Sequence, residues 1–264
     1  MNKIGFIGMG NMALAIVEGF LHSGKVKKEE VYAYAPNQDK LRANADRIGF
    51  SPVANTKELV KLSDMVIIAC KPYQIEEVLK DISEELAGKA ILSVAAGWVY
   101  DTYHAILGDA VRIQCIMPNT PAMVGEGVML FEAKNSLTDA EHVWMLDLFD
   151  SLGLVEELPT ELMGIGGAVT GCGPAFMDLI MEAYADAAVK YGIPRTKAYK
   201  LVSQTMLGSA KLQQVTGNHP GVLKDAVCSP AGTTILGVDA LEHGGLRATC
   251  IDSIDVIMNR QNKK

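Results

Sequence analysis

Residues 3–13 read Lys-Ile-Gly-Phe-Ile-Gly-Met-Gly-Asn-Met-Ala, and this stretch decides the fold of the first half of the chain. Its beginning, Lys3–Ile7, predicts a β-strand, and Asn11–His22 predicts a helix because its apolar residues recur at helical spacing. Between them, Gly8-Met9-Gly10-Asn11-Met12-Ala13 has the form GxGxxA. In this context the first glycine permits a tight turn, the second lets a pyrophosphate approach the backbone, and Ala13 lets the helix pack on the sheet. The stretch therefore predicts a dinucleotide site at a helix start, and a glycine turn without a ligand is the weaker alternative.

Short apolar runs then alternate with helical patterns as far as Pro159. The further predicted strands are Glu30–Ala35, Met65–Cys70, Ala90–Ala95, Val111–Met117, Val128–Phe131 and Leu154–Leu158, and the helices among them are Tyr73–Leu86 and Asp139–Leu152. Alternation of this kind predicts an α/β fold with a mostly parallel sheet covered on both faces.

No strand pattern follows Pro159, and the rest of the chain reads as helices. The predicted helices are Ala175–Tyr191, Arg195–Val215, His219–Val227, Thr233–Glu242 and Leu246–Arg260. Proline near helix starts and glycine after helix ends support these bounds. We therefore divide the chain into an α/β domain, residues 1–159, and an all-helical domain, residues 160–264.

The composition excludes several classes of function. The formal net charge of -7 disfavours nucleic acid and anionic membranes as partners. The 5 cysteines form no CxxC pair and the histidines have no metal-ligand spacing, so we expect no metal and a reducing compartment. The first strand leaves no room for a signal peptide, and the longest uncharged region, Met163–Met177, is rich in glycine. We expect a cytoplasmic protein without a membrane span.

The end of the second predicted strand bears on the choice of cofactor. NAD-binding sites usually carry Asp or Glu there, and this chain has Ala35 and Pro36 instead. Asn37 can donate a hydrogen bond to a 2′-phosphate, and Lys40 and Arg42 follow closely. We therefore expect NADPH as the cofactor, with use of NADH as the alternative.

Four further strings carry a family resemblance. They are Ala69-Cys70-Lys71-Pro72, Met117-Pro118-Asn119-Thr120-Pro121, Thr170-Gly171-Cys172-Gly173-Pro174-Ala175, and the long run from His219 to Ile235 that contains Ser229-Pro230-Ala231-Gly232-Thr233-Thr234. Together with the GxGxxA loop, and in this order along essentially the whole chain, they resemble the pyrroline-5-carboxylate reductases. The family commonly has Gly in place of Ala231 and Ser in place of Cys172, and an Ala is costly only where a positive φ is required.

The resemblance implies a Rossmann-like dinucleotide-binding domain followed by a helical dimerisation and substrate-binding domain. It implies an intertwined homodimer, with five dimers assembling into a homodecamer. It also implies NADPH-dependent hydride transfer to the C=N bond of a small-molecule substrate, 1-pyrroline-5-carboxylate, giving L-proline in the last step of proline biosynthesis.

The hydroxyl-rich string predicts the substrate site. A protonated imine is a good electrophile, so a hydroxyl near its nitrogen suffices and no strong acid is needed. We expect Ser229 and the amides of Gly232 and Thr233 to bind the substrate carboxylate at a helix start. Thr234 is the predicted catalytic residue, with its hydroxyl at the ring nitrogen. A Ser-Pro turn followed by a helix cap is the structural alternative.

Loops after the strands complete the expected cofactor site, because ligands of such sheets bind at the carboxyl ends of the strands. We assign Ala69, Lys71, Pro72, Asn119 and Pro121 to it, near the ribose and nicotinamide of the cofactor. Asn55 is either a family cofactor contact or a plain helix cap. His219 is expected to help start a helix, with a general-acid role as the alternative.

Two rival interpretations remain. A β-hydroxyacid dehydrogenase would need a lysine on the first long helix, which here offers Asp178, Glu182 and Asp186, with Lys190 only at its end. A nucleotide-binding sensor without turnover would not need the hydroxyl-rich string. Turnover with the cyclic imine separates both from the favoured interpretation.

Overall fold

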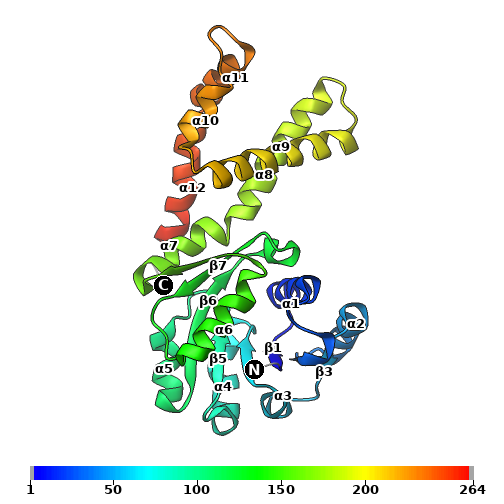
Figure 1. The fold of residues 1–264 in the computed structure, drawn as a ribbon, viewed down its shortest axis with the longest axis vertical. Coiled ribbons are helices and arrows are strands. Elements are labelled where there is room, and N and C mark those ends of the chain that lie inside the picture. The colour runs from blue at the N-terminus through cyan, green and yellow to red at the C-terminus, as the bar shows by residue number, and fades with distance from the viewer. Residues whose placement is uncertain (1–2, 262–264) are drawn as a thin grey trace. The chain divides into compact units, whose positions relative to one another are not determined.

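The computed structural model describes residues 3–261 and divides into two compact units between Cys172 and Gly173 (Figure 1). We call residues 3–172 the sheet unit and residues 173–261 the helical unit. This division lies after the functional boundary predicted at residue 159, because the intervening helix α7, Thr160–Thr170, packs on the sheet.

The sheet unit is built on an eight-stranded sheet in the order β3-β2-β1-β4-β5-β6-β7-β8. All neighbours are parallel except β6 and β7. The strands are β1 Ile4–Ile7, β2 Val31–Tyr34, β3 Ser51–Pro52, β4 Met65–Ile68, β5 Ala90–Ser93, β6 Arg112–Pro118, β7 Gly127–Glu132 and β8 Gly153–Leu158. The predicted, mostly parallel α/β fold is confirmed.

Helices cover both faces of this sheet, and each face has its own hydrophobic core. One core includes Phe20 of α1, Leu41 of α2 and Phe149 of α6. The other includes Leu79 of α4 and Tyr103 of α5. The helices are α1 Asn11–Ser23, α2 Gln38–Ile48, α3 Thr56–Leu62, α4 Pro72–Leu86, α5 Tyr100–Leu107 and α6 Asp139–Asp150, with short 3₁₀ turns η1 Lys28–Glu30, η2 Gly108–Ala110 and η3 Thr120–Val124.

Helix α7 approaches the sheet through two glycines. A Cβ on Gly167 would lie 1.8 Å from the Met117 sulfur, and a Cβ on Gly166 would lie 2.7 Å from the side chains of Leu130 and Leu158. A methyl group at either position would require the side chains of Met117, Leu130 or Leu158 to move. The glycines of α7 are unfavourable in a helix and make the segment look irregular in the sequence. In the fold, the same glycines let α7 pack closely against the sheet.

The helical unit comprises α8 Gly173–Lys190, α9 Arg195–Thr216, α10 Pro220–Ala226, α11 Thr233–His243 and α12 Leu246–Gln261. As predicted, residues 173–261 contain no strand. Within residues 173–260 only Ala185 and Ala198 are buried. The unit thus leaves most of its apolar side chains without cover from its own chain.

One region, Thr160–Lys190, is by length and composition apolar enough to cross a membrane, and an 18-residue window within it has a mean hydropathy of 1.2. The helix is interrupted at Gly171 and Cys172, which separate α7 from α8. The first part of the region packs on β6, β7 and β8 of the sheet unit.

Candidate active site

A pocket of about 310 Å³ opens where the strand order of the sheet reverses, between β1 and β4. Ligands of doubly wound sheets bind at this switch point, outside the carboxyl ends of the strands. The pocket is lined by the loops after β1, β2 and β4 and by residues of α2 and α4, namely Ile7, Gly8, Met9, Gly10, Tyr34, Ala35, Pro36, Asn37, Lys40, Leu41, Asn44, Ala69, Cys70, Lys71, Gln74 and Val78.

The glycine loop has the shape that a pyrophosphate requires. Gly8 has φ +97°, and a Cβ there would lie 2.5 Å from the Cys70 nitrogen, so only glycine fits. Gly10 faces open space, with no heavy atom within 4 Å of a Cβ placed on it. Gly10 is also the N-cap of α1, and it has no side chain to bond the first N–H groups of the helix. An anion can therefore approach the helix start, and these residues fit a dinucleotide.

The first residues of α1 place the rest of the GxGxxA loop. Asn11 and Met12 open the helix beside Gly10. Ala13 is buried against the sheet, which is the packing role predicted for it. The structure thus brings Gly8, Met9 and Gly10 into the pocket and puts Ala13 behind it.

The loop after β2 supplies the part of the pocket beside α2. Among the described residues that line the pocket, none is Asp or Glu. Asn37 caps α2, because its Oδ1 accepts a hydrogen bond of 2.9 Å from the Lys40 nitrogen. Lys40 and Asn44, one turn apart on α2, line the pocket, whereas Arg42 lies on the exposed surface. Lys40 is therefore the cation that α2 contributes to the lining of the pocket.

The loop after β4 closes the other wall. Ala69 and Lys71 line the pocket, and Pro72 begins α4. Gln74 Oε1 accepts a hydrogen bond of 3.2 Å from the Lys71 nitrogen and so fixes the loop. Burial raises the pKa of the Cys70 thiol, so this group stays neutral beside the pocket.

Two predicted cofactor residues have structural partners within the sheet unit. Asn55 is the N-cap of α3, and its Oδ1 accepts a hydrogen bond of 2.8 Å from the Glu58 nitrogen. Asn119 is 5% exposed, and both ends of its side-chain amide are bonded. Pro121 lies in η3, the turn that follows Asn119.

The predicted substrate residues lie together in the helical unit, at a tight turn before α11. The Gly232 nitrogen donates to the Ser229 carbonyl at 3.0 Å, and Pro230 and Ala231 occupy the turn between them. Ala231 has φ +58° and is the one non-glycine residue with a positive φ in the described chain. Proline at the second position and a positive φ at the third are the pattern of a type II turn.

The turn brings the predicted groups to the start of one helix. A Cβ on Gly232 would lie 2.4 Å from Ser229 Oγ, so the serine hydroxyl lies directly beside the glycine. Gly232 is the N-cap of α11 and has no side chain to bond its N–H groups. Thr233 and Thr234 open the helix and are exposed in the single chain. Hydroxyls and helix N–H groups therefore meet at one surface, as a carboxylate site needs.

His219 starts α10 in the manner expected. Its Nδ1 accepts a hydrogen bond of 3.0 Å from the Gly221 nitrogen, which assigns the ring proton to Nε2. The first long helix also has the predicted composition, because Lys190 is the last residue of α8.

Sequence inspection overlooked several lining residues of the nucleotide pocket. Asn44 follows Lys40 and Val78 follows Gln74 by four residues, so each pair shares one helix face. This spacing would have identified Asn44, Gln74 and Val78 once α2 and α4 had been placed beside the glycine loop.

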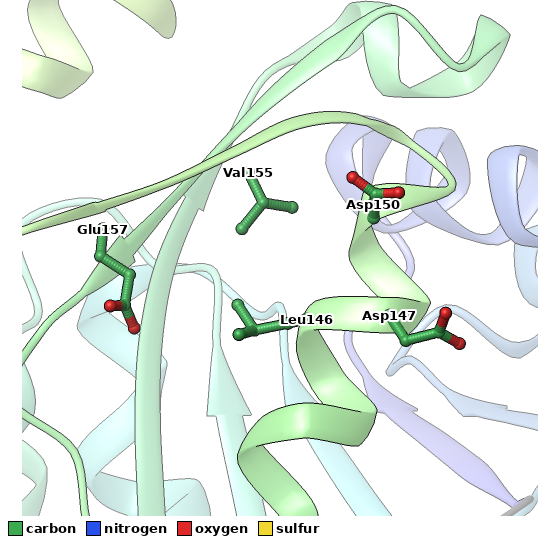
Figure 2. A pocket seen from close by; sticks show the side chains of 5 residues that line it. All are labelled: Leu146, Asp147, Asp150, Val155 and Glu157. Atoms are coloured by element: carbon green, nitrogen blue, oxygen red, sulfur yellow. The ribbon is translucent and has the colours of Figure 1, made fainter.

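A second hollow of about 390 Å³ lies between α6 and β8 (Figure 2). It is lined by Leu146, Asp147, Asp150, Val155 and Glu157, and its three carboxylates would repel a phosphate. Asp147 is already paired with Lys25 at 2.7 Å. Within residues 3–261 no three His, Cys, Asp or Glu side chains form a group that could hold a metal ion.

Two family models match separate parts of the chain. The family model described as pyrroline-5-carboxylate reductase dimerisation matches residues 160–264. The model described as NADP oxidoreductase, coenzyme F420-dependent, matches residues 3–97. The two matches agree with the nucleotide pocket in the sheet unit and with the uncovered apolar surface of the helical unit.

Relatives match over almost their whole length. The pyrroline-5-carboxylate reductase of Treponema pallidum is 41% identical over 256 residues, which are 96% of this chain and 97% of the relative. That of Escherichia coli is 38% identical over 262 residues, 99% of this chain and 97% of the relative. The crystal structure of Plasmodium falciparum pyrroline carboxylate reductase with NADP bound superposes with a TM-score of 0.89 at 29% identity, covering 98% of this chain and 97% of that one. The chain belongs to the pyrroline-5-carboxylate reductase family.

Proposed function

We propose that this protein reduces the C=N bond of 1-pyrroline-5-carboxylate with NADPH and releases L-proline, the last step of proline biosynthesis. The observation that carries the proposal is the joint presence of a glycine-loop nucleotide pocket and of the Ser229–Thr234 turn in a chain of this family. One of them suits a dinucleotide, and the other suits a small carboxylate.

The sheet unit holds the cofactor, which supplies the hydride when bound. Gly8, Met9, Gly10, Asn11 and Met12 present N–H groups to the pyrophosphate, and Ala13 keeps α1 close to the sheet. Lys40 and the Nδ2 of Asn37 face the 2′-phosphate, which favours NADPH over NADH. The remaining proposed contacts are Asn55, Ala69, Lys71, Pro72, Asn119 and Pro121, and those in the loops after β4 and β6 follow the carboxyl ends of strands.

The turn before α11 holds the substrate. Ser229 Oγ and the N–H groups of Gly232 and Thr233 bind its carboxylate at the positive end of the helix dipole. Thr234 Oγ1 accepts a hydrogen bond from the protonated ring nitrogen and orients the imine carbon for hydride transfer. The ring nitrogen is already protonated, so no side chain has to act as an acid. A neutral hydroxyl is therefore sufficient to bind it.

The two regions have distinct tasks in this proposal. Residues 1–159 form the cofactor-binding domain, and residues 160–264 form the dimerisation and substrate-binding domain. Self-association follows from the dimerisation region, and we extend it to a homodimer and, by resemblance, to a homodecamer. We place the protein in the cytoplasm, since its 5 widely spaced cysteines fit a reducing compartment. Its net charge of -7 argues against nucleic acid and anionic membranes as partners.

The decisive experiment is NADPH consumption with racemic pyrroline-5-carboxylate. The expected result is oxidation of NADPH at 340 nm with proline identified as the product, and a lower KM for NADPH than for NADH. A 3-oxo acid and a hydroxy acid serve as comparison substrates. Turnover of these in place of the imine would assign the chain to dehydrogenase chemistry, and NADPH binding without any turnover would make it a sensor.

A further inference from the structure

Asn119 stands at the point where β6 ends and the proposed nicotinamide loop begins. It is buried, and its side chain bonds in two directions. Its Oδ1 accepts a hydrogen bond of 2.9 Å from the Val128 nitrogen in β7, and its Nδ2 donates one of 3.0 Å to the Thr170 carbonyl. Thr170 is the last residue of α7, two residues before the end of the sheet unit.

We propose that Asn119 is a positioning residue for hydride transfer, which fixes the loop after β6 to the C-terminal end of α7, and that its side chain is not a ligand of the cofactor. This inference rests on the proposed function. It changes the role of Asn119 within the proposed site and links that site to the segment Gly171–Gly173, from which the helical unit departs.

The loop that Asn119 holds contains η3, which packs closely between α1 and β7. A Cβ on Gly19 of α1 would lie 2.4 Å from the Ala122 oxygen, and a Cβ on Gly127 of β7 would lie 2.7 Å from the Ala122 nitrogen. η3 therefore touches backbone on both sides, including the helix whose start receives the pyrophosphate. A rigid arrangement of this kind transmits small shifts instead of absorbing them.

Helix α7 is also fixed at its other end. Thr160 Oγ1 donates a hydrogen bond of 2.6 Å to Glu132 Oε1, and the fully buried Glu132 also accepts one of 2.7 Å from the Tyr100 nitrogen. With Thr160 held by Glu132 and Thr170 held by Asn119, α7 has two polar attachments to the sheet unit in addition to its glycine contacts. Loosening the Asn119 attachment frees the end that leads to the helical unit.

Hydride transfer is sensitive to such loosening, because misplacement by about 1 Å can cost about a hundredfold in rate. The substitution Asn119→Asp tests the link with little change of shape. It keeps an oxygen for the Val128 nitrogen and replaces the Nδ2 donor with an oxygen that faces the Thr170 carbonyl. We expect kcat to fall about tenfold to a hundredfold, because the loosened loop would misplace the reacting atoms by up to about 1 Å. The dissociation constant of NADPH, measured by fluorescence titration, should change less than about twofold because the glycine loop is untouched.

A pH profile supplies the independent readout. Burial and the facing carbonyl should raise the pKa of the introduced carboxyl, and its protonated form can again donate to Thr170. The kcat of N119D relative to wild type should therefore recover as the pH falls from about 8 to about 5.5. A merely structural role would lower the melting temperature without this recovery.

Asn135 provides a matched control. Its Nδ2 donates to the Ala133 carbonyl at 3.2 Å and its Oδ1 accepts from the Leu137 nitrogen at 3.1 Å, so it makes the same two kinds of bond within one surface loop. N135D should leave kcat and its pH profile unchanged.

The alternatives give different results. A tenfold weaker binding of NADPH by N119D would overturn the proposal and make Asn119 a cofactor ligand. A variant with wild-type kcat per folded enzyme would overturn it as well. A wild-type enzyme without turnover of the imine would instead refute the proposed function, before any variant is compared.

Discussion

Ala231 occupies a backbone conformation that glycine adopts at no steric cost. Its φ of +58° stands at the third position of the turn between Ser229 and Gly232. A left-handed conformation costs an L-residue roughly 1–2 kcal/mol. Because Ala231 has a positive φ, replacing the family's usual glycine with alanine is costly at this position. The resulting backbone strain lies inside the proposed substrate loop.

Replacing Ala231 with Gly should therefore stabilise the protein. The substitution relieves roughly 1–2 kcal/mol of backbone strain. The greater freedom of glycine in the unfolded state offsets about 0.4–1 kcal/mol of this, so the free energy of unfolding should rise by about 1 kcal/mol. For a chain of this size the melting temperature should rise by about 2–4 °C. Ala226→Gly is the control, because Ala226 lies in α10 with ordinary helical backbone and should lower the melting temperature. A lower melting temperature for A231G would mean that the methyl group has contacts that outweigh the strain.

Thr234 carries the sharpest prediction about the chemistry. If its hydroxyl meets the ring nitrogen, Thr234→Ala leaves a desolvated N–H unpaired, at a cost of about 1–3 kcal/mol. The expected loss in kcat/KM is about tenfold to a hundredfold, with little change in the dissociation constant of NADPH. Thr234→Ser keeps the hydroxyl and should lose much less. An alanine variant with near wild-type kcat/KM and only a lower melting temperature would reduce Thr234 to a helix-start residue and pass the hydroxyl role to Ser229 or Thr233.

At the scale of elements, α7 depends on its glycines for contact with the sheet. Gly167→Ala should destabilise the protein by about 1–3 kcal/mol through overpacking, although alanine is the better helix former by about 1 kcal/mol. The reason is that the new methyl group would lie 1.8 Å from the Met117 sulfur. Thermal unfolding measures the loss, and a double-mutant cycle with Met117→Ala attributes it.

The cycle also provides the control. Met117→Ala alone removes the side chain of a partly buried residue and should be destabilising, but it makes room for the methyl group. The double variant should then be more stable than the sum of the two single effects by about 1 kcal/mol or more. Strict additivity would show that Gly167 is not packed against Met117.

How far the sequence predicted these elements depended on the strength of their patterns. Strands such as Met65–Ile68 are continuous apolar runs, which are easily recognised. The bounds of each observed strand lie within about two residues of the predicted ones, except for the two-residue strand β3, which was not predicted. The polar helix α2 was not predicted, because few of its residues are apolar. Helices α3 and α5 were not predicted, because 7 and 8 residues are too few to show a clear helical period. Helix α7 was hidden by its glycines, which the fold uses for packing and which a propensity argument counts against a helix.

The residues of the candidate site also differ in how well the sequence predicted them. Gly8, Met9 and Gly10 follow from local chain geometry, so the motif alone placed them in the pocket that the structure contains. The choice of Lys40 over Arg42 required the orientation of α2. The bond between Asn119 and Thr170 joins residues 51 positions apart, and no local pattern encodes such a pair. Contacts of this kind depend on the tertiary fold.

At the scale of the whole molecule, the two units differ in how well they cover their own apolar groups. The sheet unit has two extensive cores, whereas the helical unit buries only Ala185 and Ala198 within residues 173–260. Its helices expose large apolar side chains, among them Leu179, Tyr191, Leu201, Val215, Leu236, Ile251 and Val256. Uncovered apolar surface on this scale marks an interaction surface.

The uncovered helices lead to the last prediction, that the protein is an obligate dimer at least. Burial of one large apolar side chain stabilises a fold by about 1.5–3 kcal/mol relative to leaving it in water. Covering these side chains with the helical unit of a second copy would therefore stabilise the protein substantially. Sedimentation velocity should give a dimer or a larger assembly of dimers, and the melting temperature should rise with protein concentration by mass action. A shortened chain that ends at Cys172 is the control, because the sheet unit has its own cores and should unfold at a temperature independent of concentration. If the full-length chain instead sediments as a stable monomer that turns over the imine, the helical unit must be covered by its own chain, and the dimer is not required for the site.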